Sequence, residues 1–348
     1  MNLYIHIPFC AVKCAYCALH SRPASTPGER ARYISSIANA IRTLPHAAFS
    51  TVYIGGGTPS QCNLAPIFSA LQHRLAPDCE FTVECNPADS SRDLFAQWLS
   101  SGVNRISFGV QSFHQPLLAA MNRRHTATEA VAAVTAASAA GFTNIGIDLI
   151  AGYPGLDSAI WRATLSTALS LPLSHISIYS LILEPGTPLA LSRTPIPSDD
   201  AALDQILFAS SLLSSRGFSR YEISNYSLPS FHCRHNMAVW MGEDYIGLGE
   251  GAHGRIGLVR TIANTPSETL SPRADALERF IFSLRTSTGL DLSRIPTSFN
   301  VLSPDLPRFR SALAHAVSTG LCTLSPPSTY TLTPRGMECC DSILSSLL

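Results

Sequence analysis

Short apolar runs alternate with helix-periodic stretches along the first two thirds of the chain. The apolar runs are bounded by turn residues, as is typical of buried strands, and the stretches between them repeat apolar residues at helical spacing. The predicted strands are residues 3–7, 51–55, 80–84, 104–108, 144–150 and 175–181. The predicted helices are residues 29–44, 64–75, 93–101, 128–140, 158–170 and 199–216.

Strands and helices that alternate in this way predict an α/β fold with parallel strands and right-handed crossovers. A complete barrel of this kind has eight strand–helix units, and this pattern lacks two of them. It therefore favours an open, partial (β/α)6 barrel. In such folds the loops that follow the strands carry the chemistry, so functional residues are expected in those loops.

The pattern changes after a last strand-like run at residues 220–224. Glycines then cluster over residues 247–257, helical periodicity returns at residues 274–286 and 307–319, and two extended runs lie around residues 322–333. The chain is therefore predicted to form two domains. Residues 1–227 form the partial barrel, and residues 228–348 form a smaller C-terminal domain, helical with a β-wing in the manner of a winged helix.

Charge and hydropathy narrow the classes of partner. Lysine plus arginine and aspartate plus glutamate number 24 each, so the formal net charge is zero. No block of like charge stands out, which counts against nucleic acid or an anionic membrane as the main partner. The most apolar stretches fall short of the roughly 18 consecutive apolar residues of a membrane span. The N-terminus lacks the features of a secretory signal, and a cytoplasmic location is expected.

The ten cysteines of the chain indicate reduced thiols and metal binding more than a disulfide framework. Three of them, Cys10, Cys14 and Cys17, follow the first predicted strand with C-x3-C-x2-C spacing. A cubane cluster has four irons, so three thiolates leave one iron open to a small molecule. The remaining cysteines are scattered, and buried or incidental thiols explain them.

Zinc is the competing interpretation of the cysteine loop. Structural zinc usually has four protein ligands in two spaced pairs, and the sequence has no second pair at suitable spacing. His20 could supply a fourth ligand, so zinc stays open on the residues alone.

Further polar motifs follow other predicted strands. The loop after the second strand reads Gly-Gly-Gly-Thr-Pro-Ser at residues 55–60, and glycines allow backbone N–H groups to approach a charged ligand closely. Glu84 ends the third strand, Gln111 lies beyond the fourth, and Asp148 lies in the fifth. Taken singly, a tight turn or a structural polar residue explains each one. Their positions at successive strand ends favour a shared site.

Together with the cysteine loop, these motifs resemble the radical S-adenosylmethionine superfamily. The resemblance implies a [4Fe–4S] cluster on Cys10, Cys14 and Cys17, S-adenosylmethionine on its open iron, and an electron donor for the cluster. The positions that match the superfamily's cofactor contacts are Tyr4, Tyr16, Gly56, Gly57, Thr58, Glu84, Gln111, Arg123 and Asp148. For the two tyrosines, core packing is the alternative.

Within the superfamily the chain resembles the oxygen-independent coproporphyrinogen III oxidase-like group over essentially its whole length. The matching stretches are residues 4–10, 109–113, 183–187, 221–225 and 244–254. Oxidases of this group carry another cysteine two residues after the triad, where this chain has Leu19, and a long N-terminal arm, whereas nine residues precede Cys10 here. Both differences favour the heme chaperones of the same group.

Those chaperones have a His-Asn-x-x-Tyr-Trp motif, and this chain reads His-Asn-Met-Ala-Val-Trp at residues 235–240, with Val239 in place of tyrosine. An imidazole can ligate heme iron and an indole can pack on a porphyrin. His235 and Trp240 are therefore predicted heme contacts, with Cys233 as a second candidate ligand and His253 as a further one. An ordinary hydrogen-bonding histidine is the alternative.

The expected function is a heme chaperone that binds heme, a [4Fe–4S] cluster and S-adenosylmethionine and delivers heme to an acceptor protein. The first alternative is an oxygen-independent coproporphyrinogen III oxidase, a radical decarboxylase of porphyrinogen. The second is a radical enzyme that acts on another substrate. No catalytic residue is assigned from the sequence.

Overall fold

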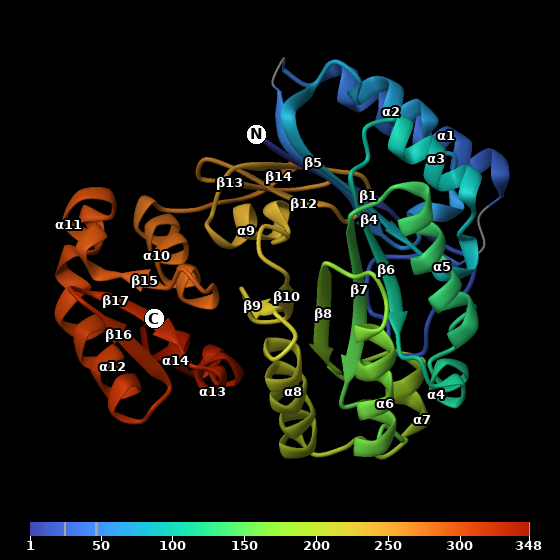
Figure 1. Ribbon diagram of the computed structural model, residues 1–348. Helices are drawn as coiled ribbons and strands as arrows, with labels where there is room; N and C mark the ends of the chain where they lie inside the picture. Colours follow the sequence, from blue (N-terminus) through green and yellow to red (C-terminus); the bar gives the residue numbers. More distant parts are fainter. Residues whose placement is uncertain (24–25, 46–47, 348) are drawn as a thin grey trace.

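A central sheet of parallel strands organises the computed structural model, which describes residues 1–23, 26–45 and 48–347 (Figure 1). Its central part runs in the order β1-β4-β5-β6-β7-β8, with every neighbouring pair parallel. These strands are β1 (Asn2–Ile7), β4 (Phe49–Gly56), β5 (Leu75–Cys85), β6 (Arg105–Gln111), β7 (Asn144–Ala151) and β8 (His175–Ser180). The predicted strands and their parallel order are thus confirmed.

Helices cover the outer face of this sheet (Figure 1). The predicted ones are α1 (Pro27–Thr43), α2 (Ala65–Leu71), α3 (Arg92–Ser100), α5 (Ala127–Ala140), α6 (Ser158–Leu169) and α8 (Asp199–Ser214). Local signals fix their ends. In α5 the Thr126 side chain and Glu129 form a reciprocal capping box, and Gly141 ends the helix at φ +116°. Two short helices, α4 (Gln115–Ala120) and α7 (Pro188–Ser192), were not predicted.

Side chains alternate along the parallel strands between an apolar and a polar face. In β4, Val52 and Ile54 are fully buried in the main hydrophobic core, whereas Tyr53 lies between them on the other face. The register places Tyr53 beside Tyr4 of β1. The same alternation in the other strands gives the barrel a polar interior, and its apolar face packs under the helices.

The sheet stays open because further strands extend both of its edges and do not join. Beyond β8 lie β10 (Asn225–Ser227) and β9 (Ser219–Arg220). Beyond β1 lie β11 (Tyr245–Leu248), β12 (His253–Ile256), β13 (Val259–Ile262) and β14 (Thr265–Thr269). This geometry confirms the partial barrel. The strand expected at residues 220–224 is instead two short strands around a turn.

The domain boundary expected at residue 228 falls too early. Strand β11 pairs in parallel with β1, so residues 245–269 belong to the main sheet. A second hydrophobic core begins at Ala276 and ends at Leu347. Around it pack β15 (Leu290–Asp291), β16 (Cys322–Ser325), β17 (Thr329–Leu332), α10 (Pro272–Phe282), α11 (Ile295–Ser298), α12 (Leu306–Ser318), α13 (Pro334–Glu338) and α14 (Cys340–Leu347). The predicted small helical domain with a β-wing is confirmed.

Membrane insertion finds no support in the helices. Over the described ranges, none combines the length and the apolar character that a bilayer crossing demands.

Several ion pairs join the two domains, and one of them is largely buried between Arg220 and the last part of the chain. The Arg220 guanidinium lies 2.5 Å from the Glu338 carboxylate, and the two side chains are only 8% and 14% exposed. A buried charge that loses its partner costs far more than an exposed one.

We therefore expect Glu338→Ala to lower the free energy of unfolding by about 3 kcal/mol, because it strands the Arg220 charge. Asp341→Ala is the matched control, since Asp341 pairs with Arg285 but is 89% exposed, and its loss should cost less than about 1 kcal/mol. Urea unfolding measures both. Equal losses in the two variants would contradict a special role for the Arg220 pair.

Candidate functional site

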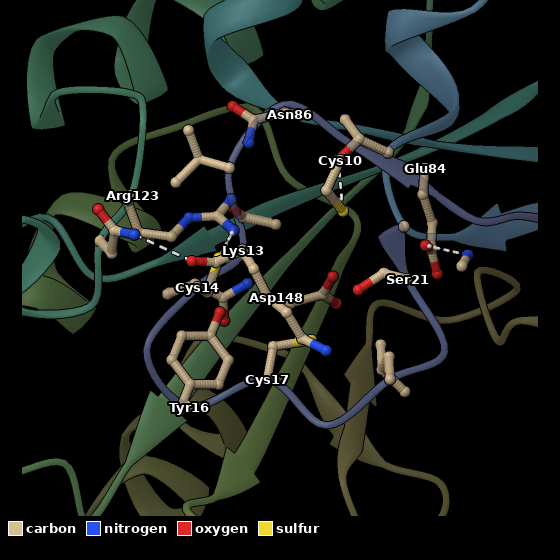
Figure 2. Close-up of a pocket in the computed structure, with 18 of the residues that line it drawn as sticks. Cys10, Lys13, Cys14, Tyr16, Cys17, Ser21, Glu84, Asn86, Arg123 and Asp148 are labelled. Atoms are coloured by element: carbon tan, nitrogen blue, oxygen red, sulfur yellow. Dashed lines mark hydrogen bonds between the residues drawn. The ribbon is translucent and has the colours of Figure 1, made fainter. Parts of the chain in front are cut away.

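A cavity of about 460 Å³ lies at the carboxyl ends of the parallel strands. Its lining comes from the end of β7 and from the ends of β4, β5, β6 and β8 or the loops that follow them and β1, and Figure 2 shows many of these side chains. Most residues singled out in the sequence lie there together: Cys10, Cys14, Tyr16, Cys17, Gly56, Gly57, Thr58, Glu84, Gln111, Arg123 and Asp148. The strand order brings them into one place, because parallel strands end at the same edge.

The three cysteines of the loop are free thiols that face this cavity (Figure 2). The Thr58 hydroxyl donates to Cys10 Sγ at 3.4 Å, and Arg123 Nη1 donates to Cys14 Sγ at 3.2 Å. Donors of this kind stabilise thiolates, which are the form that ligates metal. Burial raises the pKa of the Cys17 thiol, so its thiolate needs the compensating charge of a metal.

The geometry of possible metal ligands bears on which metal group the loop can hold. Within the described ranges, no three His, Cys, Asp or Glu side chains are arranged to hold one metal ion. The ligands of a cubane cluster bind different irons and stand further apart than the ligands of one ion. Three thiols on one loop are the donor set that a cubane cluster with one open iron uses.

Two short helices hold the cysteine loop in place. At the end of α4 the Met121 carbonyl accepts from Ala15 N at 3.0 Å, and Asn122 Nδ2 donates to the Lys13 carbonyl at 2.9 Å. In α7, Leu189 N donates to the Ala15 carbonyl at 2.8 Å. The loop backbone is thus fixed on both sides before any metal binds.

The glycine turn after β4 lies directly under the start of the cysteine loop. Gly57 N donates to the Ile7 carbonyl at 2.8 Å, and a Cβ on Gly57 would lie 2.9 Å from the Phe9 carbonyl oxygen. Gly56 has φ +112°, and a Cβ there would meet the His6 ring at 2.7 Å. Only glycine fits these two positions.

Two carboxylates form the inner end of the cavity. Glu84 accepts from the Tyr53 hydroxyl at 2.8 Å and from Gly56 N at 3.2 Å. Burial, together with the neighbouring Asp148, raises the pKa of Glu84 to about 7. Burial also raises the pKa of Asp148, which accepts from the Ser107 hydroxyl at 3.4 Å. Half-buried carboxylates with raised pKa values suit a ligand that brings positive charge.

Sequence reasoning missed Arg105 and Tyr53, which support these carboxylates from inside the barrel. Arg105 begins β6 and is buried, and its Nε and Nη1 have no partner among the described residues. Its positive charge lowers the pKa of both Glu84 and Asp148 against the effect of burial. The signal that could have found both residues is their alternation with fully apolar neighbours in β4 and β6.

Tyr4 does not line the cavity. It lies deeper in the barrel, where its hydroxyl is 3.0 Å from His6 Nδ1 and its ring lies 6.3 Å from the His235 ring. The core-packing alternative describes its position better than a direct cofactor contact does.

The three predicted heme contacts also lie away from the cavity. His235 is 5% exposed, and its Nδ1 is 2.8 Å from the Thr51 hydroxyl. Cys233 is fully buried, and its thiol donates to Glu80 at 3.6 Å. Trp240 packs against Phe282 and under the Arg285 guanidinium. The exposed His253 lies on β12, also outside the cavity lining.

Known proteins share both the sequence and the fold. Residues 4–168 match the radical SAM superfamily model. The heme chaperone HemW of Lactococcus lactis is 33% identical over 323 residues, which cover 86% of this chain and 85% of that protein. HemW of Escherichia coli is 35% identical over 84% of this chain and 79% of its own length. HemW of Mycobacterium tuberculosis is 34% identical over 84% of both.

The fold also matches a solved structure. Coproporphyrinogen III oxidase (HemN) from Escherichia coli, a radical SAM enzyme, superposes with a TM-score of 0.85 over 99% of this chain and 89% of that one. At 22% identity this likeness establishes the shared fold alone. The similarity to the HemW proteins extends over most of both lengths, and the chain therefore belongs to the HemW family of the radical SAM superfamily.

Proposed function

We propose that this chain is a heme chaperone, which binds heme and passes it to a heme-requiring acceptor protein. The HemW relatives are named for this activity, and they align with most of this chain. The observation that carries the proposal further is the cavity in which three free cysteines lie together with the carboxylates of Glu84 and Asp148. A [4Fe–4S] cluster and S-adenosylmethionine are the cofactors that this donor set fits.

In this proposal Cys10, Cys14 and Cys17 hold the cluster. Such a cluster, held by these residues, would supply one-electron reducing power toward the sulfonium of S-adenosylmethionine once an electron donor had reduced it. Backbone groups of the glycine turn and the Glu84 carboxylate receive the amino group of that cofactor. Arg123 and Thr58 keep the cysteine sulfurs oriented through their hydrogen bonds. The shielded inner end of the cavity keeps bulk water from the charged groups.

Heme itself is proposed to dock at the cavity mouth, where apolar side chains stand exposed. Leu19 and Ile182 line the cavity and are 61% and 70% exposed. They offer an apolar surface to a porphyrin face, and Lys13 in the same lining offers a cation to a propionate. Oxidases of the wider group have a cysteine where Leu19 stands, so this chain replaces a polar, reactive side chain by an apolar contact.

The metal proposal predicts about four irons per chain after anaerobic reconstitution. Cys10→Ala, Cys14→Ala and Cys17→Ala should each abolish the broad cluster absorbance, since each removes one of three ligands. Cys322→Ala is the control, because Cys322 is buried in the C-terminal core and should leave iron content unchanged. Zinc uptake without iron would contradict the cluster.

The Glu84 carboxyl predicts a pH dependence for S-adenosylmethionine binding. Its pKa is raised to about 7, so the carboxylate forms as pH rises through that value and protonates as pH falls. A sulfonium ligand should therefore bind more tightly above about pH 7 and up to about tenfold more weakly per pH unit below it. Equilibrium dialysis with the cluster-loaded protein measures the dissociation constant. Glu84→Gln should bind weakly with a flat profile, and an unaltered slope in that variant would assign the titration elsewhere.

Two assays under anaerobic, reducing conditions test the function. In a heme titration we expect a stoichiometric Soret band, and in an incubation with coproporphyrinogen III we expect no release of carbon dioxide. Leu19→Asp at the cavity mouth should weaken heme binding about tenfold or more, because it places a charge against the porphyrin. Leu324→Asp is the control on the C-terminal domain, where Leu324 is also exposed. Steady release of carbon dioxide by the unmodified protein would favour the oxidase.

A further inference from the structure

Helix α9 (Arg234–Trp240), which carries the His-Asn-Met-Ala-Val-Trp segment, contacts both domains. At its first turn His235 enters the polar interior of the barrel, near Tyr4 and Tyr53. At its last residue Trp240 meets the C-terminal domain through Phe282. Figure 1 shows α9 between the sheet and that domain. The segment therefore lies between the two domains, and the proposed function gives it no role.

A barrel carboxylate fixes the start of α9. Glu80 of β5 accepts from Arg234 N at 2.9 Å and from His235 N at 3.0 Å. The residue at the N-cap position, Cys233, makes no side-chain cap of its own. Glu80 therefore supplies the capping acceptor from a different part of the chain. The backbone of His235 is held against the strands by this contact.

The His235 ring is held just as firmly. Its Nδ1 is 2.8 Å from the Thr51 hydroxyl, which donates to Asn2 at 2.9 Å. Burial and the nearby Arg105 lower the pKa of His235 to about 4, so the ring is neutral at ordinary pH. Its centroid lies 5.3 Å from the Tyr53 ring, with 35° between the planes. The neutral imidazole therefore packs on one side of Tyr53.

Tyr53 links this histidine to the cavity. Its hydroxyl donates to Glu84 Oε1 at 2.8 Å, and Glu84 lines the cavity. We infer that His235 is a positioning residue for the S-adenosylmethionine pocket, whose ring sets Tyr53 so that Tyr53 holds the Glu84 carboxylate. The inference rests on the proposed binding of that cofactor at Glu84. It gives the segment a role in cofactor binding and not in direct contact with heme iron.

The competing role, an axial ligand to heme, conflicts with these contacts. His235 is 5% exposed, so heme iron can reach it only if α9 leaves the barrel. That movement breaks the two hydrogen bonds to Glu80 and the contact with Thr51. It would also leave the Glu80 carboxylate buried without these partners, which is costly.

Two substitutions distinguish the contribution of the His235 ring from that of its hydrogen bond to Thr51. His235→Asn keeps a polar group for Thr51 but removes the ring that packs on Tyr53. His235→Phe keeps a ring and loses the bond. Trp161→Phe is the matched control, because Trp161 of α6 is also buried and loses a single hydrogen bond, from its Nε1 to the Gln205 carbonyl at 2.8 Å, outside the cavity lining. Tyr53→Phe is the reference for loss of the bond to Glu84.

The measurement is the dissociation constant of S-adenosylmethionine across pH, with cluster-loaded protein. His235→Asn should weaken binding about tenfold, comparable to losing a hydrogen bond to a charged group. It should also move the midpoint of the pH profile upward, as Tyr53→Phe does, because the Tyr53 hydroxyl favours the ionised Glu84. His235→Phe should bind closer to the unmodified protein. The double variant of Tyr53→Phe and His235→Asn should bind no more weakly than Tyr53→Phe alone.

Other groups near Glu84 stay constant across this series. The titratable or charged residues that face it from the neighbouring strands are Tyr4, Tyr53, Arg105, Asp148 and Tyr179. Since only Tyr53 among them is changed, an upward shift shared by Tyr53→Phe and His235→Asn traces to the bond between Tyr53 and Glu84.

The outcomes separate this inference from the function on which it rests. Intact cofactor affinity and pH profile in His235→Asn would overturn it. Loss of the Soret band in His235→Asn with unchanged S-adenosylmethionine binding would overturn it in favour of an axial ligand. If Trp161→Phe reproduced the effect of His235→Asn, the role would be general stability of the barrel. Failure of the unmodified protein to bind S-adenosylmethionine would remove the proposed function as well.

Discussion

The polar interior of the barrel is the constraint on which the rest of the structure depends. Strand alternation turns one side chain in two away from the helices, and in this chain many of those inward residues are ionisable. A buried charge must find a partner, because desolvation costs several kcal/mol per ion. Glu80 finds one in the first amides of α9, and Glu84 finds one in Tyr53 and Gly56. The buried Arg105 lies among these carboxylates.

This arrangement gives the two ends of the barrel different properties. At the end closed by α9, Glu80 is fully occupied by the helix. At the open end, Glu84 and Asp148 share their surroundings with the cavity, and their carboxyl pKa values are raised. Ionising these two carboxyls inside the protein costs free energy. A cationic ligand lowers that free-energy cost, whereas an apolar ligand does not. The cavity therefore prefers positive charge inside and apolar surface at its mouth, which are the preferences expected for S-adenosylmethionine and for heme.

The sequence predicted the parts of this molecule that depend on local pattern. The parallel strands, their covering helices and the cysteine loop follow from periodicity and spacing, and parallel order then brings the loops together. Pairing between strands that are far apart in the chain could not be predicted from local pattern. Strand β11 pairs with β1, although almost the whole barrel lies between them in the sequence. The helices α4 and α7 are too short to show a helical period. The domain boundary was misplaced for the first of these reasons.

The role of His235 illustrates the same limit within the site. A histidine followed by asparagine looks like a surface ligand, and nothing local to residues 235–240 signals burial. Its environment comes from Thr51, Tyr53 and Glu80, all more than 150 residues earlier in the chain. Tyr4 and Arg105 are interior for the same reason, since each occupies an inward position set by the register of its neighbours.

An anaerobic crystal structure with cluster, S-adenosylmethionine and heme all present tests the account most directly. The account predicts iron anomalous signal for the cluster at Cys10, Cys14 and Cys17, with the cofactor's amino group at Glu84 and the glycine turn. It also predicts that His235 stays packed on Tyr53 while the heme iron lies outside the barrel. Heme iron bound to His235, with α9 displaced from Glu80, would contradict it.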